Sequence, residues 1–221
     1  LNDLFVLRVG SGAGATPVWE DITTNATGVR PAARTEHTAT IANLAMLPGS
    51  PHGMLLFGGK DGSGVALADL HAFTFSTMTW TTLGPTGVPP QARKGHTSAL
   101  LLNSLLCIFG GSNEDVPIFY NDVRIYDMNR NTWMTPTVST TTAAPDGRDG
   151  HSMIEISGKV YIYGGVNARG EKLSDLWSFN VFSAVAGQLR WSQPTAMSSV
   201  PPTRWGHLGL ASMGAMHIIG G

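Results

Sequence analysis

A four-residue motif, Arg-x-x-His, recurs at nearly constant intervals and sets the framework for the whole chain. It occurs at Arg34–His37, Arg93–His96, Arg148–His151 and Arg204–His207, so successive arginines lie 55 to 59 residues apart. A chain with an internal period of this length builds its fold from one unit repeated in tandem. The 221 residues therefore amount to about four units rather than to one or two unrelated domains.

Three further landmarks follow each Arg-x-x-His tetrad in a fixed order. A Gly doublet ends an apolar run, an Asp followed by an aliphatic residue comes next, and a tryptophan closes the unit. The doublets are Gly58-Gly59, Gly110-Gly111, Gly164-Gly165 and Gly220-Gly221, the Asp pairs are Asp3-Leu4, Asp69-Leu70, Asp122-Val123 and Asp175-Leu176, and the tryptophans are Trp19, Trp80, Trp133 and Trp191. Four landmarks in one order indicate a true repeat.

The apolar runs within a unit are short, β-branched or aromatic, and bounded by turn residues, which is typical of strands. In the best-defined unit we expect four strands, over 95–102, 105–111, 123–127 and 132–134. Two-residue links such as Asn103-Ser104 are of the kind that closes tight hairpins, so neighbouring strands run antiparallel. No long window keeps a 3.6-residue period, so helix content should be close to nil. The sequence predicts an all-β fold.

Tandem four-stranded units of about 50 residues bury their faces against one another around an axis, as the blades of a β-propeller do. The tetrad, the Gly doublet, the Asp-Leu segment and the final Trp together resemble the kelch repeat, the blade unit also found in the propeller domain of galactose oxidase. The resemblance covers essentially the whole chain. It implies rings of about five to seven blades, which is more than this sequence supplies.

The landmarks divide the chain into three full blades and two half blades. Residues 34–92, 93–147 and 148–203 each form a blade, residues 1–33 end a preceding blade, and residues 204–221 begin a following one. A ring of six blades would need roughly 330 residues. We therefore expect a partial ring of a larger propeller.

Composition limits the classes of partner. The 14 Lys and Arg against 15 Asp and Glu give a net charge of −1, which offers no electrostatic footprint for nucleic acid or for an anionic membrane. No apolar stretch approaches the ~18 residues of a membrane span. The single cysteine, Cys107, excludes an internal disulfide framework and favours a reducing compartment. We expect a cytoplasmic protein that takes part in a larger assembly.

The repeated residues are expected to be structural in the first place. The Gly doublets permit backbone angles or close packing that a Cβ would block, and the tryptophans carry apolar area between adjacent blades. Resemblance to kelch places the tetrad histidine in the innermost strand, where it would hydrogen-bond a neighbouring blade. The tetrad arginines leave two alternatives open: they bind carbonyls or carboxylates of the fold, or they face acidic side chains of a partner as a partial ring. Those arginines are Arg34, Arg93, Arg148 and Arg204.

Function is expected in the segments that differ between blades. After the doublets these are 60–68, 112–121 and 166–174, and by analogy they border one face together with the segments before the tetrads, 84–92, 136–147 and 194–203. The candidate partner-binding residues there are Asp61, Asn113, Glu114, Phe119, Tyr120, Asn167 and Arg169, and the same segments also contain Asp115. On the opposite face a longer link, 48–53, replaces one tight hairpin, and a docking role is a minor alternative for it.

No catalytic or metal-binding constellation is visible. The copper site of galactose oxidase is made by tyrosines, histidines and a cross-linked cysteine, whereas Cys107 lies inside an apolar strand and most resembles a small buried hydrophobe. We therefore predict a non-catalytic scaffold that needs no cofactor and docks a protein or peptide on its loop-bearing face. The alternative is a regulatory or structural propeller of a longer enzyme, such as a kelch-containing serine/threonine phosphatase.

Overall fold

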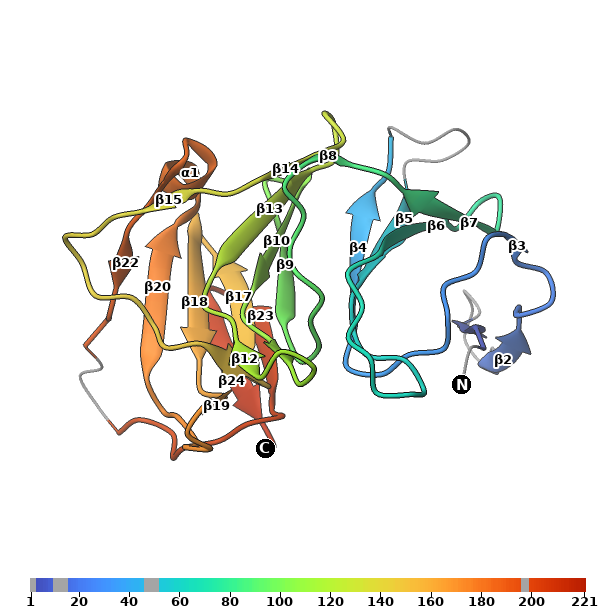
Figure 1. Ribbon diagram of the computed structural model, residues 1–221. Coiled ribbons are helices and arrows are strands. Elements are labelled where there is room, and N and C mark those ends of the chain that lie inside the picture. Colours follow the sequence, from blue (N-terminus) through green and yellow to red (C-terminus); the bar gives the residue numbers. More distant parts are fainter. Residues whose placement is uncertain (1–2, 10–15, 46–51, 196–198) are drawn as a thin grey trace.

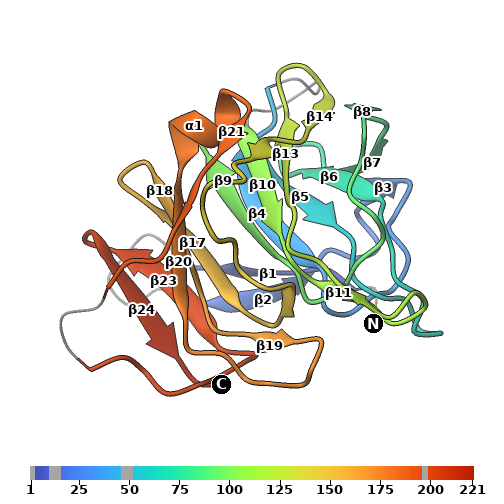
Figure 2. The same cartoon turned by 60° about the vertical axis from the view of Figure 1, so that its left-hand side comes forward.

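A computed structural model of the chain describes residues 3–9, 16–45, 52–195 and 199–221. Three consecutive units each fold into a twisted antiparallel sheet, and the three sheets stand side by side (Figures 1 and 2). In chain order their strands are β4 Thr38–Asn43, β5 His52–Phe57, β6 Leu70–Thr74 and β7 Thr79–Leu83; β9 Thr97–Leu101, β10 Leu105–Phe109, β13 Val123–Asp127 and β14 Thr132–Met134; and β17 Ser152–Ile156, β18 Lys159–Tyr163, β20 Leu176–Asn180 and β22 Trp191–Ser192. The all-β prediction is confirmed.

Two strand pairs flank the three sheets. They are β1 Phe5–Arg8 with β2 Val18–Asp21, and β23 Leu208–Ser212 with β24 Ala215–Ile219. Each lies in a separate two-stranded sheet, so the sheets do not close into a ring among the described residues. The arrangement is that of a partial propeller, as the repeat predicts.

Short segments tie each blade to the next. The linker after one blade's last strand runs parallel to the last strand of the following blade: β3 Thr27–Gly28 pairs with β7, and β8 Thr86–Gly87 pairs with β14. In the third blade the partner of β15 Thr137–Val138 is instead β21 Gln188–Leu189. Strand β21 follows the short helix α1 Val181–Val185, which Asn180 caps through its side chain. This insertion between β20 and β22 is the one departure from the expected absence of helix among the described residues.

The hydrophobic core lies between blades rather than within them. One cluster joins Leu55 and Phe57 of the first full blade to Tyr126 and Trp133 of the second, and the next joins Phe109 of the second to residues of the third. The ring of Trp133 meets Phe57 edge to face at 5.6 Å, and Trp191 meets Phe109 in the same way at 5.3 Å. The tryptophans therefore fill the contacts between adjacent blades, which we call seams. Trp19, in the flanking pair, is 67% exposed.

The hairpin links lie on one face and the loops after the doublets on the other, at the top and bottom of Figure 1 respectively. The link between β9 and β10 turns at Leu102 and Asn103, both with positive φ, one residue earlier than expected. The link 48–53 lies mostly outside the described residues, as does part of 194–203. We call the two sides the hairpin face and the loop-bearing face.

Both glycines of a doublet are required by backbone conformation and by close approach. Gly110 has φ +69°, and a Cβ built there would lie 2.6 Å from the His151 ring and 2.8 Å from the Arg148 carbonyl oxygen. Gly111 has φ +89°, and its Cβ would meet the backbone of Lys94 and His96. The doublet thus allows one blade's second strand to touch the next blade's tetrad.

Replacing Gly110 with Val should disrupt the fold, because the side chain has no room and the backbone angle disfavours it. We expect a loss of about 4 kcal/mol or more in the free energy of unfolding, measured by urea denaturation. Gly62→Ala is the matched control, since a Cβ at Gly62 meets nothing within 4 Å and its φ is not positive. Equal stability of the two variants would contradict the assignment.

Candidate functional site

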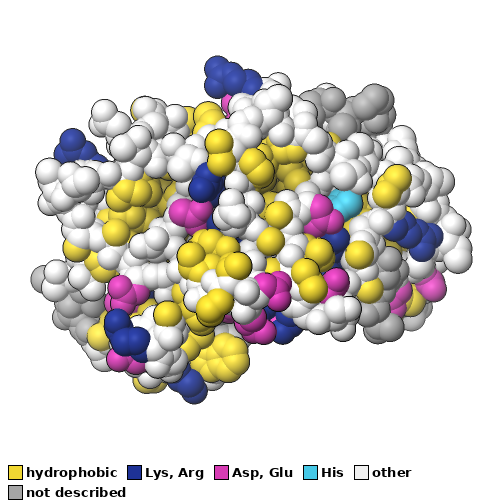
Figure 3. Space-filling model, viewed as in Figure 1, with side chains coloured by type: hydrophobic (Ala, Val, Ile, Leu, Met, Phe, Trp, Pro, Cys, Tyr) yellow, Lys and Arg dark blue, Asp and Glu magenta, His cyan; other side chains and the backbone are white. Residues whose placement is uncertain are grey.

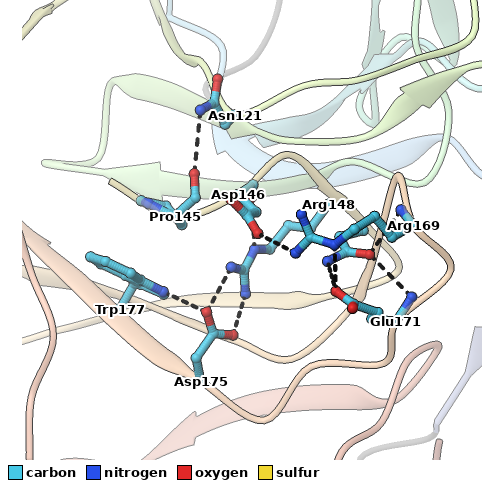
Figure 4. Close-up of polar contacts among 9 residues, drawn as sticks. Asn121, Pro145, Asp146, Arg148, Arg169, Glu171, Asp175 and Trp177 are labelled. Atoms are coloured by element: carbon cyan, nitrogen blue, oxygen red, sulfur yellow. Dashed lines mark hydrogen bonds and ion pairs between the residues drawn. The ribbon is translucent and has the colours of Figure 1, made fainter. Parts of the chain in front are cut away.

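The tetrad arginines are the most deeply placed charges on the loop-bearing side. The Arg93 guanidinium donates to both carboxylate oxygens of Asp122, at 2.7 and 3.1 Å, and to the carbonyl of Gly110 at 2.9 Å. Arg148 makes the same contacts with Asp175, at 2.7 and 2.8 Å (Figure 4). It also donates to the carbonyl of Gly164 at 3.0 Å. Arg34 binds Asp69 and Gly58 in the same way. One arrangement is therefore built three times.

This arrangement corresponds to the first alternative for the tetrad arginines, in which they bind groups of the fold. The side chains of Arg93 and Arg148 have no exposed surface, so they are inaccessible to a partner. Arg204 is half-buried and donates to the carbonyls of Pro202 and Gly220. Burial alone would raise the pKa of Asp122, yet the hydrogen bonds and charge of Arg93 hold it below its usual value. The pairs are thus ionised parts of the framework.

Three of the four tetrad histidines bind the preceding blade. The Nε2 atoms of His96, His151 and His207 lie 2.9, 2.6 and 2.9 Å from the side-chain oxygens of Thr38, Thr97 and Ser152. Burial, reinforced by the charge of Arg93, lowers the pKa of His96 to about 3, and the pKa of His151 is also well below its usual value. Both rings are therefore neutral at physiological pH. The expectation that these histidines hydrogen-bond a neighbouring blade is confirmed.

The third tetrad position links the blades through the backbone. The amide of Gly95 donates to the carbonyl of Glu36, Gly150 to Gly95, and Gly206 to Gly150, with N···O distances of 2.7 to 3.0 Å. All four residues have positive φ, between 56° and 67°. Glu36 is the exception in this series, because a non-glycine residue is disfavoured in that conformation. All four residues line one hollow on the loop-bearing face.

A network of charges lies beside this hollow, which we call the channel mouth. The ammonium group of Lys94 lies 3.0 Å from both Glu36 and Glu114 and 3.5 Å from Asp149, and Lys60 lies 2.8 Å from Glu36. The hollow has a volume of about 280 Å³, and its lining includes Trp205, which is 50% exposed. Glu114 is the predicted candidate here. Sequence reasoning missed Glu36, Lys94 and Asp149, although the variable interior of the tetrad was a signal that could have revealed them.

A second hollow, the notch, lies between the loops of adjacent blades. It has a volume of about 150 Å³ and is lined by Phe119, Asp146, Gly147, Asn167, Ala168 and Arg169. The Arg169 guanidinium joins Glu171 at 2.8 Å to Asp146 at 3.3 Å, and Asn167 donates to Glu171 (Figure 4). Three predicted residues, Phe119, Asn167 and Arg169, therefore meet in one place.

The remaining candidates shape the loops. The carboxylate of Asp61 accepts the amides of Ser63 and Val65, and Asn113 accepts the amide of Asp115. The ring of Tyr120 covers the Arg93 guanidinium at 4.1 Å and is buried. These side chains hold the conformation of the loops.

Three further kinds of site were sought in the described part of the chain: a metal site, a membrane-spanning helix and a reactive thiol. It contains no group of three or more His, Cys, Asp or Glu residues placed to hold a metal ion. Among the helices it contains, none has the length and apolar character needed to cross a membrane. Cys107 is a free thiol with no exposed surface, and burial raises its pKa to about 12.

Comparison with known proteins agrees with this architecture. The family model of the KLHDC2/KLHL20/DRC7 Kelch-repeats domain matches residues 1–221. Kelch domain-containing protein 3 of Homo sapiens is 33% identical over 172 residues, which are 73% of this chain and 42% of that protein.

Two further relatives match part of this chain. Rab9 effector protein with kelch motifs of Bos taurus is 35% identical over 134 residues, covering 60% of this chain and 34% of that protein. Tip elongation aberrant protein 1 of Schizosaccharomyces pombe is 30% identical over 166 residues, covering 75% of this chain and 14% of that protein. The matched part of the chain thus spans well under half the length of each of these relatives.

The buried histidines predict a loss of stability in mild acid. Unfolded histidine has a pKa near 6.5, whereas folded His96 titrates near 3, so between these values the unfolded chain binds protons that the folded chain cannot. Protonation of unfolded His96 should lower the free energy of unfolding by about 2 kcal/mol between pH 6.5 and 5, and His151 should act in the same direction. Urea denaturation at several pH values measures this. His96→Gln should show a shallower dependence, and an unchanged slope in that variant would contradict the origin assigned to it.

Proposed function

The chain belongs to the kelch-repeat family, and we propose that it is a non-catalytic module that docks a partner protein or peptide on its loop-bearing face. Kelch repeats are generally protein-interaction domains. One relative is named as a Rab9 effector, which supports partner binding as the activity of such repeats. The proposal includes a place in a larger assembly and, because Cys107 is unpaired, a cytoplasmic location.

The observation that carries the proposal is the separation of framework from exposed loops on one face. The Arg–Asp pairs, the histidines and the Gly doublets satisfy one another inside the blades, so the fold does not depend on the loop tips. Glu114 in the 112–121 loop and Arg169 in the 166–174 loop have side chains that are 68% and 67% exposed. Loops held by a rigid scaffold are where binding residues are found.

Contact and support are divided among the predicted residues. We assign contact with the partner to Glu114, Phe119 and Arg169, which border the channel mouth and the notch. Asp61, Asn113, Tyr120 and Asn167 would hold the loops in the conformation that the partner meets. The alternative function, as a regulatory or structural propeller of a longer enzyme, stays a prediction.

Blocking one face at a time tests the proposal. Ala168→Cys places a thiol at the notch, and Asn129→Cys places one at the turn between β13 and β14 on the hairpin face; both positions are exposed. Because Cys107 is buried with a raised pKa, a maleimide-linked polyethylene glycol should attach only to the new thiol. The label at residue 168 should abolish partner capture from native lysate, whereas the label at residue 129 should leave it intact.

The reverse pattern, or capture that survives both labels, would place binding elsewhere. The unlabelled Cys variants serve as controls for the substitutions themselves. Thermal unfolding of each labelled protein checks that the polymer has not destabilised the blades.

A further inference from the structure

The loop between β11 Ser112–Asn113 and β12 Ile118–Phe119 is paired at its base and apolar at its tip. Strands β11 and β12 pair with each other, and Ser112 exchanges backbone hydrogen bonds with Lys94 of the tetrad. At the tip, Val116 is 58% exposed and Ile118 is 41% exposed. Exposed apolar side chains on a fixed loop favour contact with another protein. The loop is therefore a preformed platform.

Carboxylates surround this platform. Glu114 and Asp115 precede Val116 directly, and Asp115 makes no ion pair with any residue that the structure describes. Acidic side chains also gather in the lower middle of the view in Figure 3, the side on which the loops after the doublets lie in Figure 1. A partner that approaches the tip of the loop therefore meets negative charge first.

The net charge of the loop-bearing face is also negative. The three Arg–Asp pairs of the tetrads are neutral and bound within the blades, so they are left out of the balance. Seven acidic residues remain against six basic ones: Glu36, Asp61, Glu114, Asp115, Asp146, Asp149 and Glu171 against Lys60, Lys94, Arg124, Arg169, Lys172 and Arg204, where Arg124 lies 2.8 Å from Asp122. On the hairpin face Arg130, Lys159 and Arg190 outnumber Asp127 and Glu155. The two faces thus carry opposite net charge although the whole chain is nearly neutral.

We propose that the partner segment docked on the loop-bearing face is a basic, extended stretch of protein that lies across the 112–119 loop. This inference rests on the proposed function and specifies the partner's chemistry. Apolar side chains of the segment cover Val116 and Ile118, and its Lys or Arg side chains lie against Glu114 and Asp115. The segment is opposite in charge to the acidic one that a ring of exposed tetrad arginines would select, because those arginines are already bound to Asp69, Asp122 and Asp175.

The physical basis is that opposite charges of the loop and the segment meet beside apolar side chains that exclude water. Asp115 has unused hydrogen-bond capacity, and Glu114 shares one lysine with Glu36, so each can accept a further cation without breaking the framework. Burial of Val116 and Ile118 removes water from around these contacts and strengthens them. Charge alone would steer a basic segment toward this face, and the apolar tip would retain it.

Two short fluorescein-labelled peptides test the proposal. Both alternate charged and valine residues, one with Lys and the other with Glu, and fluorescence anisotropy measures their binding to the whole chain. The Lys peptide should bind at least about tenfold more tightly than the Glu peptide, and its affinity should fall as salt rises from about 50 to 300 mM. Equal binding, or tighter binding of the Glu peptide, would overturn the assignment.

Matched variants locate the effect. Glu114→Gln with Asp115→Asn should weaken Lys-peptide binding about tenfold. Glu20→Gln with Asp21→Asn, an equally charged pair on β2, should leave it unchanged. Val116→Ser with Ile118→Ser should weaken binding at every salt concentration. If the two acidic pairs prove equivalent, the binding is general electrostatic attraction and the proposed docking on the loop is wrong.

Failure of this inference is distinguishable from failure of the proposed function. If the label at residue 168 blocks capture while the Lys peptide shows no preference, the face binds partners of another chemistry. If the label has no effect, the proposed function itself fails.

Discussion

The buried guanidinium of each tetrad is the interaction on which the blades depend. Arg148 binds Asp175 just before the third strand and the carbonyl of Gly164 just after the second, which closes the loop-bearing end of its own blade sheet. Its own carbonyl accepts the amide of Gly111 from the preceding blade. One residue therefore joins strands within a blade and connects that blade to its neighbour. Because a buried charge that loses its partners is costly, all these contacts must be present together.

The repeat predicted the architecture because its landmarks are local. Gly110-Gly111, Trp133 and the apolar runs fix strand ends, seams and strand order, and the structure has each where the sequence places it. The orientation of the arginines was harder to predict, since the carboxylate that binds Arg93 lies 29 residues away. The regular recurrence of one Asp for each tetrad carried that information. The helix α1 lay outside the pattern because it occupies an insertion in a single blade.

The candidate site was predictable in location and less so in chemistry. Loops that vary between blades pointed to Phe119 and Arg169, which line the notch, and to Glu114, which pairs with Lys94 beside the channel mouth. The charge at the channel mouth was missed because Lys94 and Asp149 sit inside a motif whose other positions are structural. Because the tetrad arginines are paired with Asp69, Asp122 and Asp175, they give the face no exposed basic ring, and its remaining charges are more acidic than basic. The kind of partner that a repeat protein can bind thus depends on which of its charges are already paired within the fold.

The most direct test of this account compares the stability of two arginine variants. Arg148→Ala should lower the free energy of unfolding by about 3 to 5 kcal/mol, because it leaves Asp175 and the Gly164 carbonyl without their partner. Arg169→Ala removes an exposed arginine from the same face and should leave stability close to that of the unaltered chain. Similar stabilities for both variants, measured by urea denaturation at neutral pH, would contradict the claim that the tetrad arginines hold the blades together.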